Sequence, residues 1–160
     1  MKEVILQTKM TQCKYEELDE VLRNVVDAAK NMTQNAYCPY SHFHVGAALL
    51  MEDGQILLGA NQENAAYPSG LCAERTALFA ANANHPNTPV KVLAIAAYTN
   101  GQFTKEAVSP CGACRQVMLE TEHRYGKPMK VVLYGEEMCY ILESAAELLP
   151  LNFVAESLLG

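Results

Sequence analysis

The stretch VKVLAIAAYT at residues 90–99 is a nearly continuous run of apolar residues, several of them β-branched, with the length of one strand. Such a run is typical of a central strand that helices cover on both faces. The neighbouring segments agree, because residues 72–83 are rich in Ala and Leu and residues 109–122 also favour a helix. We therefore predict a sheet enclosed between helical layers.

The remaining segments extend this pattern toward both ends of the chain. Residues 44–60 (HVGAALLMEDGQILLGA) form two apolar runs around an Asp-Gly turn, which predicts a β-hairpin. MKVVLYG at residues 129–135 predicts a strand, and SAAELLP at 144–150 a short helix. Residues 15–32 predict an amphipathic helix, with apolar side chains at Leu18, Val21, Leu22, Val25, Val26 and Ala29. Together these elements predict an α/β fold, a three-layer α/β/α sandwich with a mixed, roughly five-stranded sheet.

Length and composition favour one ordinary globular domain over residues 1–160. Half of the residues are hydrophobic and 19% are charged, which excludes a disordered chain. The formal net charge of -6 argues against nucleic acid as a partner and favours a small-molecule ligand. Since the sequence has no membrane-length apolar run and begins without signal-peptide features, we expect no membrane association and a cytoplasmic location.

Cysteine spacing carries the first chemical signal. Cys111 and Cys114 form a Cys-x-x-Cys pair at a helix start, which alone fits a zinc site, a redox dithiol or two small buried side chains. Cys72 begins another helix, and the sequence has no second Cys-x-x-Cys pair that would close a four-cysteine site. Three protein ligands with a fourth position open are typical of a catalytic zinc. The other three cysteines are interpreted as ordinary reduced thiols: Cys13, Cys38 and Cys139.

Charged residues follow these cysteines at defined helical positions. A helix turns about 100° per residue, so Glu74 points away from the Cys72 sulfur and is placed to reach a zinc-bound water rather than the metal. The alternative is a solvated glutamate that the helix dipole favours in the first turn. Arg75 and Arg115 return to the faces of Cys72 and Cys111, where their charges oppose the excess negative charge of three thiolates.

Three blocks of sequence resemble the signatures of the small homotetrameric zinc-dependent cytidine deaminases: YCPYSHFHVGAALL, NQENAAYPSGLCAERTAL and SPCGACRQVMLE. The likeness runs from about Asn35 to the ELLP at 147–150. It implies one Zn²⁺ per subunit, held by Cys72, Cys111 and Cys114. It also implies hydrolysis of free cytidine and deoxycytidine to uridine and deoxyuridine with release of ammonia, in pyrimidine salvage. In that reaction Glu74 carries protons from the water to ring N3 and to the leaving amine.

The same resemblance assigns the nucleoside contacts. It implies that Asn61 and Glu63 bind the ribose hydroxyls, that Phe43 packs against the pyrimidine and that Tyr67 lies at the edge of the site. Without it, Asn61 and Glu63 read as a polar loop, and the two rings as ordinary packing. It further implies that the apolar C-terminal segment lies at a subunit contact, with Phe153 reaching toward a neighbouring site.

Two histidines flank Phe43 and need a separate interpretation. On a strand, His42 and His44 share one face, opposite to Phe43. If Phe43 faces the base, both histidines face elsewhere. We therefore expect neither to bind zinc.

Two other functions remain open at this point. The first is a related deaminase that acts on a base within RNA or DNA or on an antibiotic such as blasticidin, although the acidic charge disfavours nucleic acids and NQEN favours a ribose. A non-enzymatic binding module with a structural zinc is the second, although structural sites are normally closed by four protein ligands.

Overall fold

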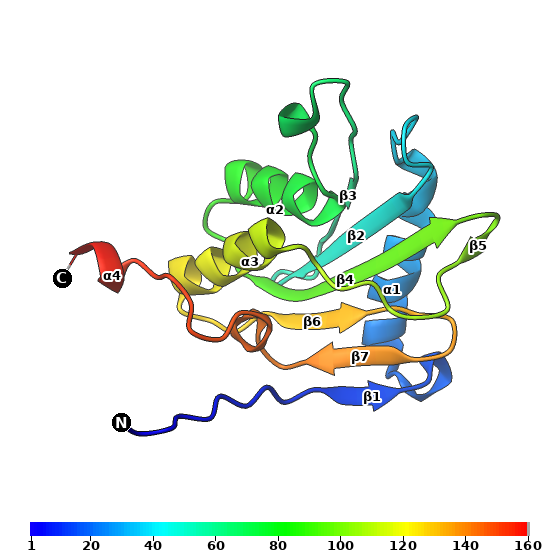
Figure 1. The fold of residues 1–160 in the computed structure, drawn as a ribbon. Coiled ribbons are helices and arrows are strands. Elements are labelled where there is room, and N and C mark those ends of the chain that lie inside the picture. The colour runs from blue at the N-terminus through cyan, green and yellow to red at the C-terminus, as the bar shows by residue number, and fades with distance from the viewer. Residues whose placement is uncertain (160) are drawn as a thin grey trace.

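The computed structural model describes residues 1–159 (Figure 1). Its helices are α1 (Glu20–Met32), α2 (Ala73–Asn84), α3 (Gly112–Tyr125) and α4 (Glu156–Leu159), with short 3-10 helices η1 (Tyr15–Glu17), η2 (Thr33–Asn35), η3 (Tyr67–Ser69) and η4 (Ala145–Leu148). Its strands are β1 (Thr11–Cys13), β2 (His44–Met51), β3 (Ile56–Ala60), β4 (Val90–Thr99), β5 (Gln102–Phe103), β6 (Lys130–Leu133) and β7 (Cys139–Leu142).

All of these strands join one mixed sheet. Its order is β1-β7-β6-β4-β2-β3, and β5 pairs with β4 off this path. β4 and β6 are parallel, whereas the other pairs are antiparallel. Four of these strands, β2, β3, β4 and β6, were located from the sequence, and roughly five were expected in total, so seven strands correct that number. The strands that were not located are short: β1 has 3 residues, β5 has 2 and β7 has 4, too few to show a periodic pattern.

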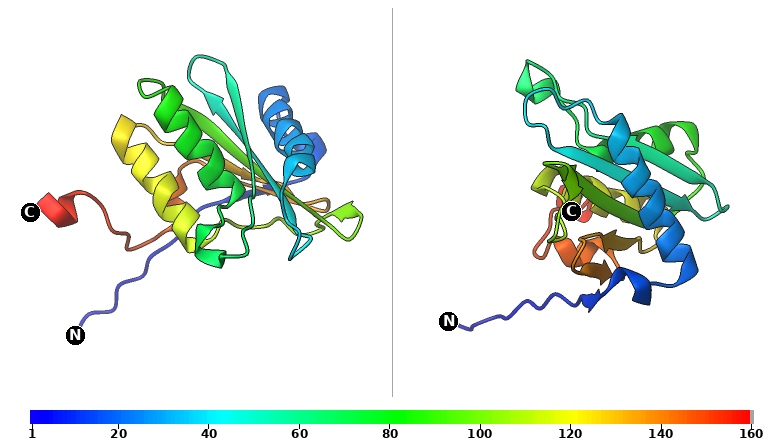
Figure 2. Two further views of the ribbon diagram at one scale, coloured as in Figure 1. Left: turned by 90° about the horizontal axis from the view of Figure 1, so that it is seen from above. Right: turned by 90° about the vertical axis from the view of Figure 1, so that its right-hand side faces the viewer.

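Helices cover both faces of the sheet, which confirms the three-layer sandwich. Figure 2 shows α1 on one face and α2 with α3 on the other. Along β4, Leu93 and Ile95 join the apolar cluster that contains α2 and α3. The alternate residues of the same strand, Val92, Ala94 and Ala96, join the cluster under α1. The apolar run at residues 90–99 is therefore a central strand buried on both sides.

The first long helix is shorter than its apolar pattern. α1 begins at Glu20, because Asp19 is its N-cap and accepts a hydrogen bond from Leu22 N at 2.8 Å. Residues Tyr15–Glu17 form the separate turn η1, and the extended backbone of Leu18 divides the two helices. The predicted start at residue 15 is therefore wrong by five residues, since a cap ended the helix that periodicity alone continued.

Close packing fixes helix α2 on the hairpin. A Cβ atom added to Gly59 of β3 would lie 2.5 Å from both Ala73 O and Ala77 N. Only glycine allows the backbone of β3 to approach the helix so closely. The first turn of α2 follows Cys72 and contains Glu74, so this contact also fixes the position of both residues.

The segment near the N-terminus bonds to η4, and the segment near the C-terminus bonds to α3. Thr8 donates to Glu147 O at 3.0 Å, and Lys9 N donates to the Glu147 carboxylate at 3.1 Å. Gln116 of α3 donates to Phe153 O at 2.9 Å before the chain continues to α4 (Figure 1). No helix within residues 1–159 has both the length and the apolar character that crossing a bilayer requires.

Candidate metal centre and adjoining pocket

Three sulfur atoms meet where α2 and α3 begin. Cys72 and Cys111 are the N-cap residues of these helices, and Cys114 lies in the first turn of α3. The Sγ atoms of Cys72 and Cys111 are 3.8 Å apart, and those of Cys111 and Cys114 are 3.4 Å apart. All three sulfurs lie within 4.8 Å of one another.

This spacing fits a tetrahedral zinc site. A Zn–S distance of about 2.3 Å places two sulfurs of a tetrahedron about 3.8 Å apart. Within residues 1–159 the group contains only these three potential ligands. Cys114 is buried, whereas Cys111 is exposed, so the group opens toward solvent on one side. Three thiolates with an open corner are the ligand set expected for a catalytic zinc.

Neighbouring donors favour ionised sulfur in this group. Hydrogen bonds from Cys114, Arg75 and Cys111 lower the pKa of Cys72 to about 5. Arg75 Nη2 donates to the Cys72 sulfur at 3.6 Å, as its position three residues later predicted. The partial positive charges of the two helix N-termini act in the same direction. Conversely, donation to Cys72 and burial raise the pKa of Cys114.

Glu74 is buried beside the sulfurs. Its exposed fraction is 5%, which excludes the alternative of a solvated first-turn glutamate. Burial and, to a lesser extent, the nearby Cys72 charge raise the pKa of its carboxyl, and a hydrogen bond from the Cys114 thiol partly opposes them. This carboxyl is therefore suited to accept and hold a proton.

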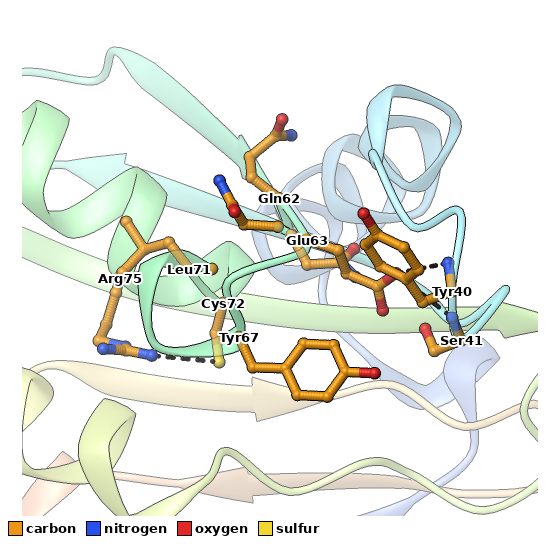
Figure 3. A pocket seen from close by; sticks show the side chains of 11 residues that line it. Tyr40, Ser41, Gln62, Glu63, Tyr67, Leu71, Cys72 and Arg75 are labelled. Carbon is orange, nitrogen blue, oxygen red and sulfur yellow. Dashed lines mark hydrogen bonds between the residues drawn. The ribbon is translucent and has the colours of Figure 1, made fainter.

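A cavity of about 550 Å³ adjoins Cys72 (Figure 3). The rings of Tyr40 and Tyr67 meet edge to face with centroids 6.3 Å apart. The cavity is lined by Tyr40, Ser41, Asn61, Gln62, Glu63, Asn64, Tyr67, Gly70, Leu71, Cys72 and Arg75.

Two polar side chains of this wall hold the loop opposite them. Glu63 accepts hydrogen bonds through Oε2 from Tyr40 N at 2.9 Å and from Ser41 N at 3.3 Å (Figure 3). The Ser41 hydroxyl, assisted by these amides, holds the pKa of the Glu63 carboxyl below its usual value. Asn61 accepts from Val45 N at 2.8 Å and donates to Phe43 O at 2.9 Å.

Residues 19–127 match the family model described as the cytidine and deoxycytidylate deaminase zinc-binding region. The matched region contains all three cysteines of the sulfur group together with Glu74. The chain belongs to this deaminase family. Zinc is the cofactor of the family's domain, and Cys72, Cys111 and Cys114 are positioned to hold a metal ion.

Curated members of the deaminase family are similar over most of their length. A protein named cytidine deaminase from Halalkalibacterium halodurans is 44% identical over 135 residues, covering 84% of this chain and 95% of the relative. A protein named probable cytidine deaminase from Dictyostelium discoideum is 39% identical over 141 residues, covering 88% of this chain and 89% of the relative.

Solved structures of the deaminase family share this fold. The cytidine deaminase of Burkholderia pseudomallei matches with a TM-score of 0.68 and 43% identity, covering 81% of this chain and 97% of its own. That of Mycobacterium tuberculosis matches with a TM-score of 0.66 and 29% identity, covering 85% and 99%. The predicted fold class is therefore confirmed.

The deaminase pocket contains some of the expected residues and omits others. Asn61, Glu63 and Tyr67 line it together with Cys72 and Arg75, whereas Phe43 is not among the described residues of its lining. Sequence reasoning missed the contributions of Tyr40 and Ser41. The available signal was Pro39 directly before them, because a proline there indicates a loop between the first long helix and β2.

Arg115 differs from the expectation for a residue that opposes the thiolates. Its Nε donates to Pro110 O at 2.9 Å, and its Nη1 donates to Leu148 O at 2.8 Å. Arg115 thus fixes the segment before Cys111 to the end of η4. The helical spacing that placed Arg75 on its cysteine did not account for these carbonyls.

The expected strand geometry around Phe43 is wrong. β2 begins at His44, and His42 has a φ of 54°, so residues 42–44 do not alternate along a strand. His44 packs edge to face on Tyr98, with ring centroids 6.1 Å apart. Neither histidine belongs to the metal-ligand group found within the described chain.

Proposed function

We propose that this chain is a zinc-dependent cytidine deaminase, which hydrolyses free cytidine and deoxycytidine to uridine and deoxyuridine and releases ammonia. The observation that carries the proposal is the buried carboxyl of Glu74 beside a three-sulfur group that is open on one side. The names and the 44% and 39% identities of the curated relatives support the same reaction. Pyrimidine salvage is its metabolic setting.

Glu74 carries the protons in this reaction. Zinc in such a site lowers the pKa of water and so supplies a nucleophile at neutral pH. Glu74 would accept one proton of that water and deliver it to ring N3. After the oxygen has bonded to C4, Glu74 would take the second proton from the C4 hydroxyl and pass it to the amine, which leaves as ammonia while the C4 carbonyl forms. Because burial raises the pKa of its carboxyl, the protonated form is accessible during the cycle. The positive charge of Arg75, which donates to the Cys72 sulfur, partly neutralises the negative charge of the thiolates.

The pocket wall selects a nucleoside. The Ser41 hydroxyl, together with the loop amides, lowers the pKa of Glu63 and so favours its ionised carboxylate, which accepts hydrogen bonds from sugar hydroxyls. Asn61 lies two residues before it on the same segment. Phe43 and Tyr67 supply aromatic surface for the base. A phosphorylated sugar is disfavoured, since the anionic carboxylate faces the same cavity.

We further propose a cytoplasmic homotetramer with one zinc per subunit. Tyr67 is 78% exposed and Phe153 is 55% exposed in the single chain. Aromatic side chains with so much free surface are typical of subunit contacts. Phe153 then lies near a neighbouring site. The cytoplasm suits this protein because thiolate ligands stay reduced there.

The direct test is deamination of cytidine by the zinc-loaded protein. We expect release of ammonia and loss of absorbance at the cytosine band, with deoxycytidine as a second substrate. Parallel reactions contain blasticidin and a short single-stranded oligonucleotide. A zinc-loaded protein that leaves cytidine unchanged, while a control deaminase is active under the same conditions, contradicts the proposal. Faster deamination of blasticidin or of the oligonucleotide than of cytidine assigns that compound as the substrate instead.

A further inference from the structure

We propose that Asn61 is a positioning residue, whose side chain fixes the pocket loop (residues 37–43) to the sheet in addition to any contact with the sugar. The kinetic part of this inference rests on the proposed deaminase activity. The structural part does not, because it concerns the loop in the free protein.

Every polar group of Asn61 bonds to the segment that contains this loop. Its Oδ1 accepts from Val45 N at 2.8 Å, and its Nδ2 donates to Phe43 O at 2.9 Å. Its backbone N donates to Val45 O at 3.2 Å, and its carbonyl accepts from Tyr37 N at 3.0 Å. Two bonds therefore hold the side chain, and two more hold the backbone of Asn61, before any ligand arrives.

These bonds continue the sheet beyond its regular end. The ladder between β2 and β3 stops at the pair Gly46 and Ala60, one residue before Asn61. The Asn61 carboxamide then bonds Val45 and Phe43 as a further strand residue would. At His42, before the chain enters the sheet, the backbone lies in the left-handed region with a φ of 54°. The carboxamide thus bonds the junction at which the loop ends and β2 begins.

Only a carboxamide satisfies both neighbours. Val45 N is a donor and requires an acceptor, whereas Phe43 O is an acceptor and requires a donor. An aspartate of the same shape provides acceptors only, so it would bring a carboxylate against the Phe43 carbonyl. The exchange of the NH₂ group for an oxygen therefore tests the loop contact with little change in volume.

Glu63 holds the tip of the same loop. Its carboxylate accepts from the amides of Tyr40 and Ser41, and its backbone N donates to Tyr37 O at 2.7 Å. Because Tyr40 and Ser41 line the cavity, the segment 61–63 fixes one wall of the pocket at its base and at its tip. Loss of the Asn61 side-chain hydrogen bonds is therefore expected to make that wall of the pocket more mobile.

The test compares Asn61→Asp with the wild type on two substrates. Cytidine has the 2′- and 3′-hydroxyls, whereas 2′,3′-dideoxycytidine lacks both and keeps only the 5′-hydroxyl. We expect kcat/KM to fall about tenfold or more on both substrates, the order expected from one lost hydrogen bond. We also expect the amides of residues 40–45 to exchange hydrogen about tenfold faster without substrate. Loss on cytidine alone, with unchanged hydrogen exchange, contradicts the inference and leaves a sugar contact only.

Two further variants keep the test decisive. Asn84→Asp is the matched control, because Asn84 Nδ2 also donates to a backbone carbonyl, that of Ala80 at 2.9 Å, on an exposed part of α2. We expect its kinetics and loop exchange to remain unchanged. If Asn61→Asp does not fold, Asn61→Ala removes both bonds without adding charge and must show the same loop exchange. If neither the wild type nor any variant deaminates cytidine, the proposed function fails. Hydrogen exchange still decides whether Asn61 fixes the loop.

Discussion

At the scale of single residues, the carboxyl of Glu74 and the thiol of Cys111 have separable roles. Glu74→Gln keeps the shape of the side chain and removes the proton carrier. We expect it to retain stoichiometric zinc while kcat falls by about 10²- to 10⁴-fold. Cys111→Ala removes a ligand, so we expect it to lose zinc as well as activity. Metal analysis of the purified variants beside the cytidine assay checks both, and a zinc-free Glu74→Gln protein would contradict the division of roles.

Tyr15 predicts a second effect at this scale, on stability at high pH. Burial, together with the Asp27 carboxylate that accepts its hydroxyl at 2.7 and 2.8 Å, raises the pKa of Tyr15 to about 12. In the unfolded chain, the tyrosine side chain has a pKa of about 10. The contribution of this proton is therefore complete below pH 10 and is lost as the pH rises toward 12.

The measurement is urea unfolding at several pH values between 9 and 12. We expect the wild type to lose more free energy of unfolding over this range than Tyr15→Phe, which has no hydroxyl to titrate. Tyr37→Phe, at a ring that is 56% exposed, is the control and should follow the wild type. Parallel curves for the wild type and Tyr15→Phe would refute the assignment.

At the scale of elements, Glu122 joins α3 to η4. Its carboxylate accepts from Met129 N at 2.6 Å, from Ala145 N at 2.8 Å and from the Ser144 hydroxyl. Glu122→Gln brings an NH₂ group against these donors, so we expect a loss of about 2 kcal/mol in the free energy of unfolding. Glu120→Gln, at an exposed position of the same helix, should change it little. Urea titrations compare the two variants, and equal stabilities would contradict this role.

Gly59 predicts how β3 controls α2. In Gly59→Ala the new methyl meets Ala73 O and Ala77 N at 2.5 Å and must push the helix outward. We expect a loss of about 1–3 kcal/mol in stability and weaker zinc retention, since Cys72 begins this helix. Gly112→Ala is the matched control, because no atom lies within 4 Å of its added Cβ. Thermal unfolding and a zinc-competition assay provide the readouts. Full zinc retention in Gly59→Ala would contradict the prediction that the packing of β3 on α2 affects the metal site.

The elements also show how far sequence reasoning reached. β4 was predicted with its observed bounds, because its apolar run is long and buried on both sides. The start of α1 was missed because the Asp19 cap, rather than periodicity, sets it. The sulfur group followed from the positions of cysteines at two helix starts. The bonds from Arg115 to Leu148 of η4 and from Asn61 to Phe43 of the loop before β2 were not predictable, because these segments approach only in the folded chain.

At the scale of the whole molecule, the exposed aromatic residues predict assembly. Sedimentation at micromolar concentration should give four times the mass of one chain if the proposed tetramer forms. Phe153→Ser should shift the protein toward smaller species and reduce activity per chain, because Phe153 is proposed to lie near a neighbouring site. An active monomer at this concentration would contradict both the tetramer and the role of Phe153.

The positions of the three sulfurs also affect how the chain unfolds. Cys72 and Cys111 are 39 residues apart, and the whole of α2, β4 and β5 lies between them. A metal ion bound by these thiolates would cross-link the chain between Cys72 and Cys111. This cross-link restricts the conformations of the unfolded chain as a disulfide does, but a chelator can remove it. Metal supply would then govern the lifetime of the protein as well as its turnover.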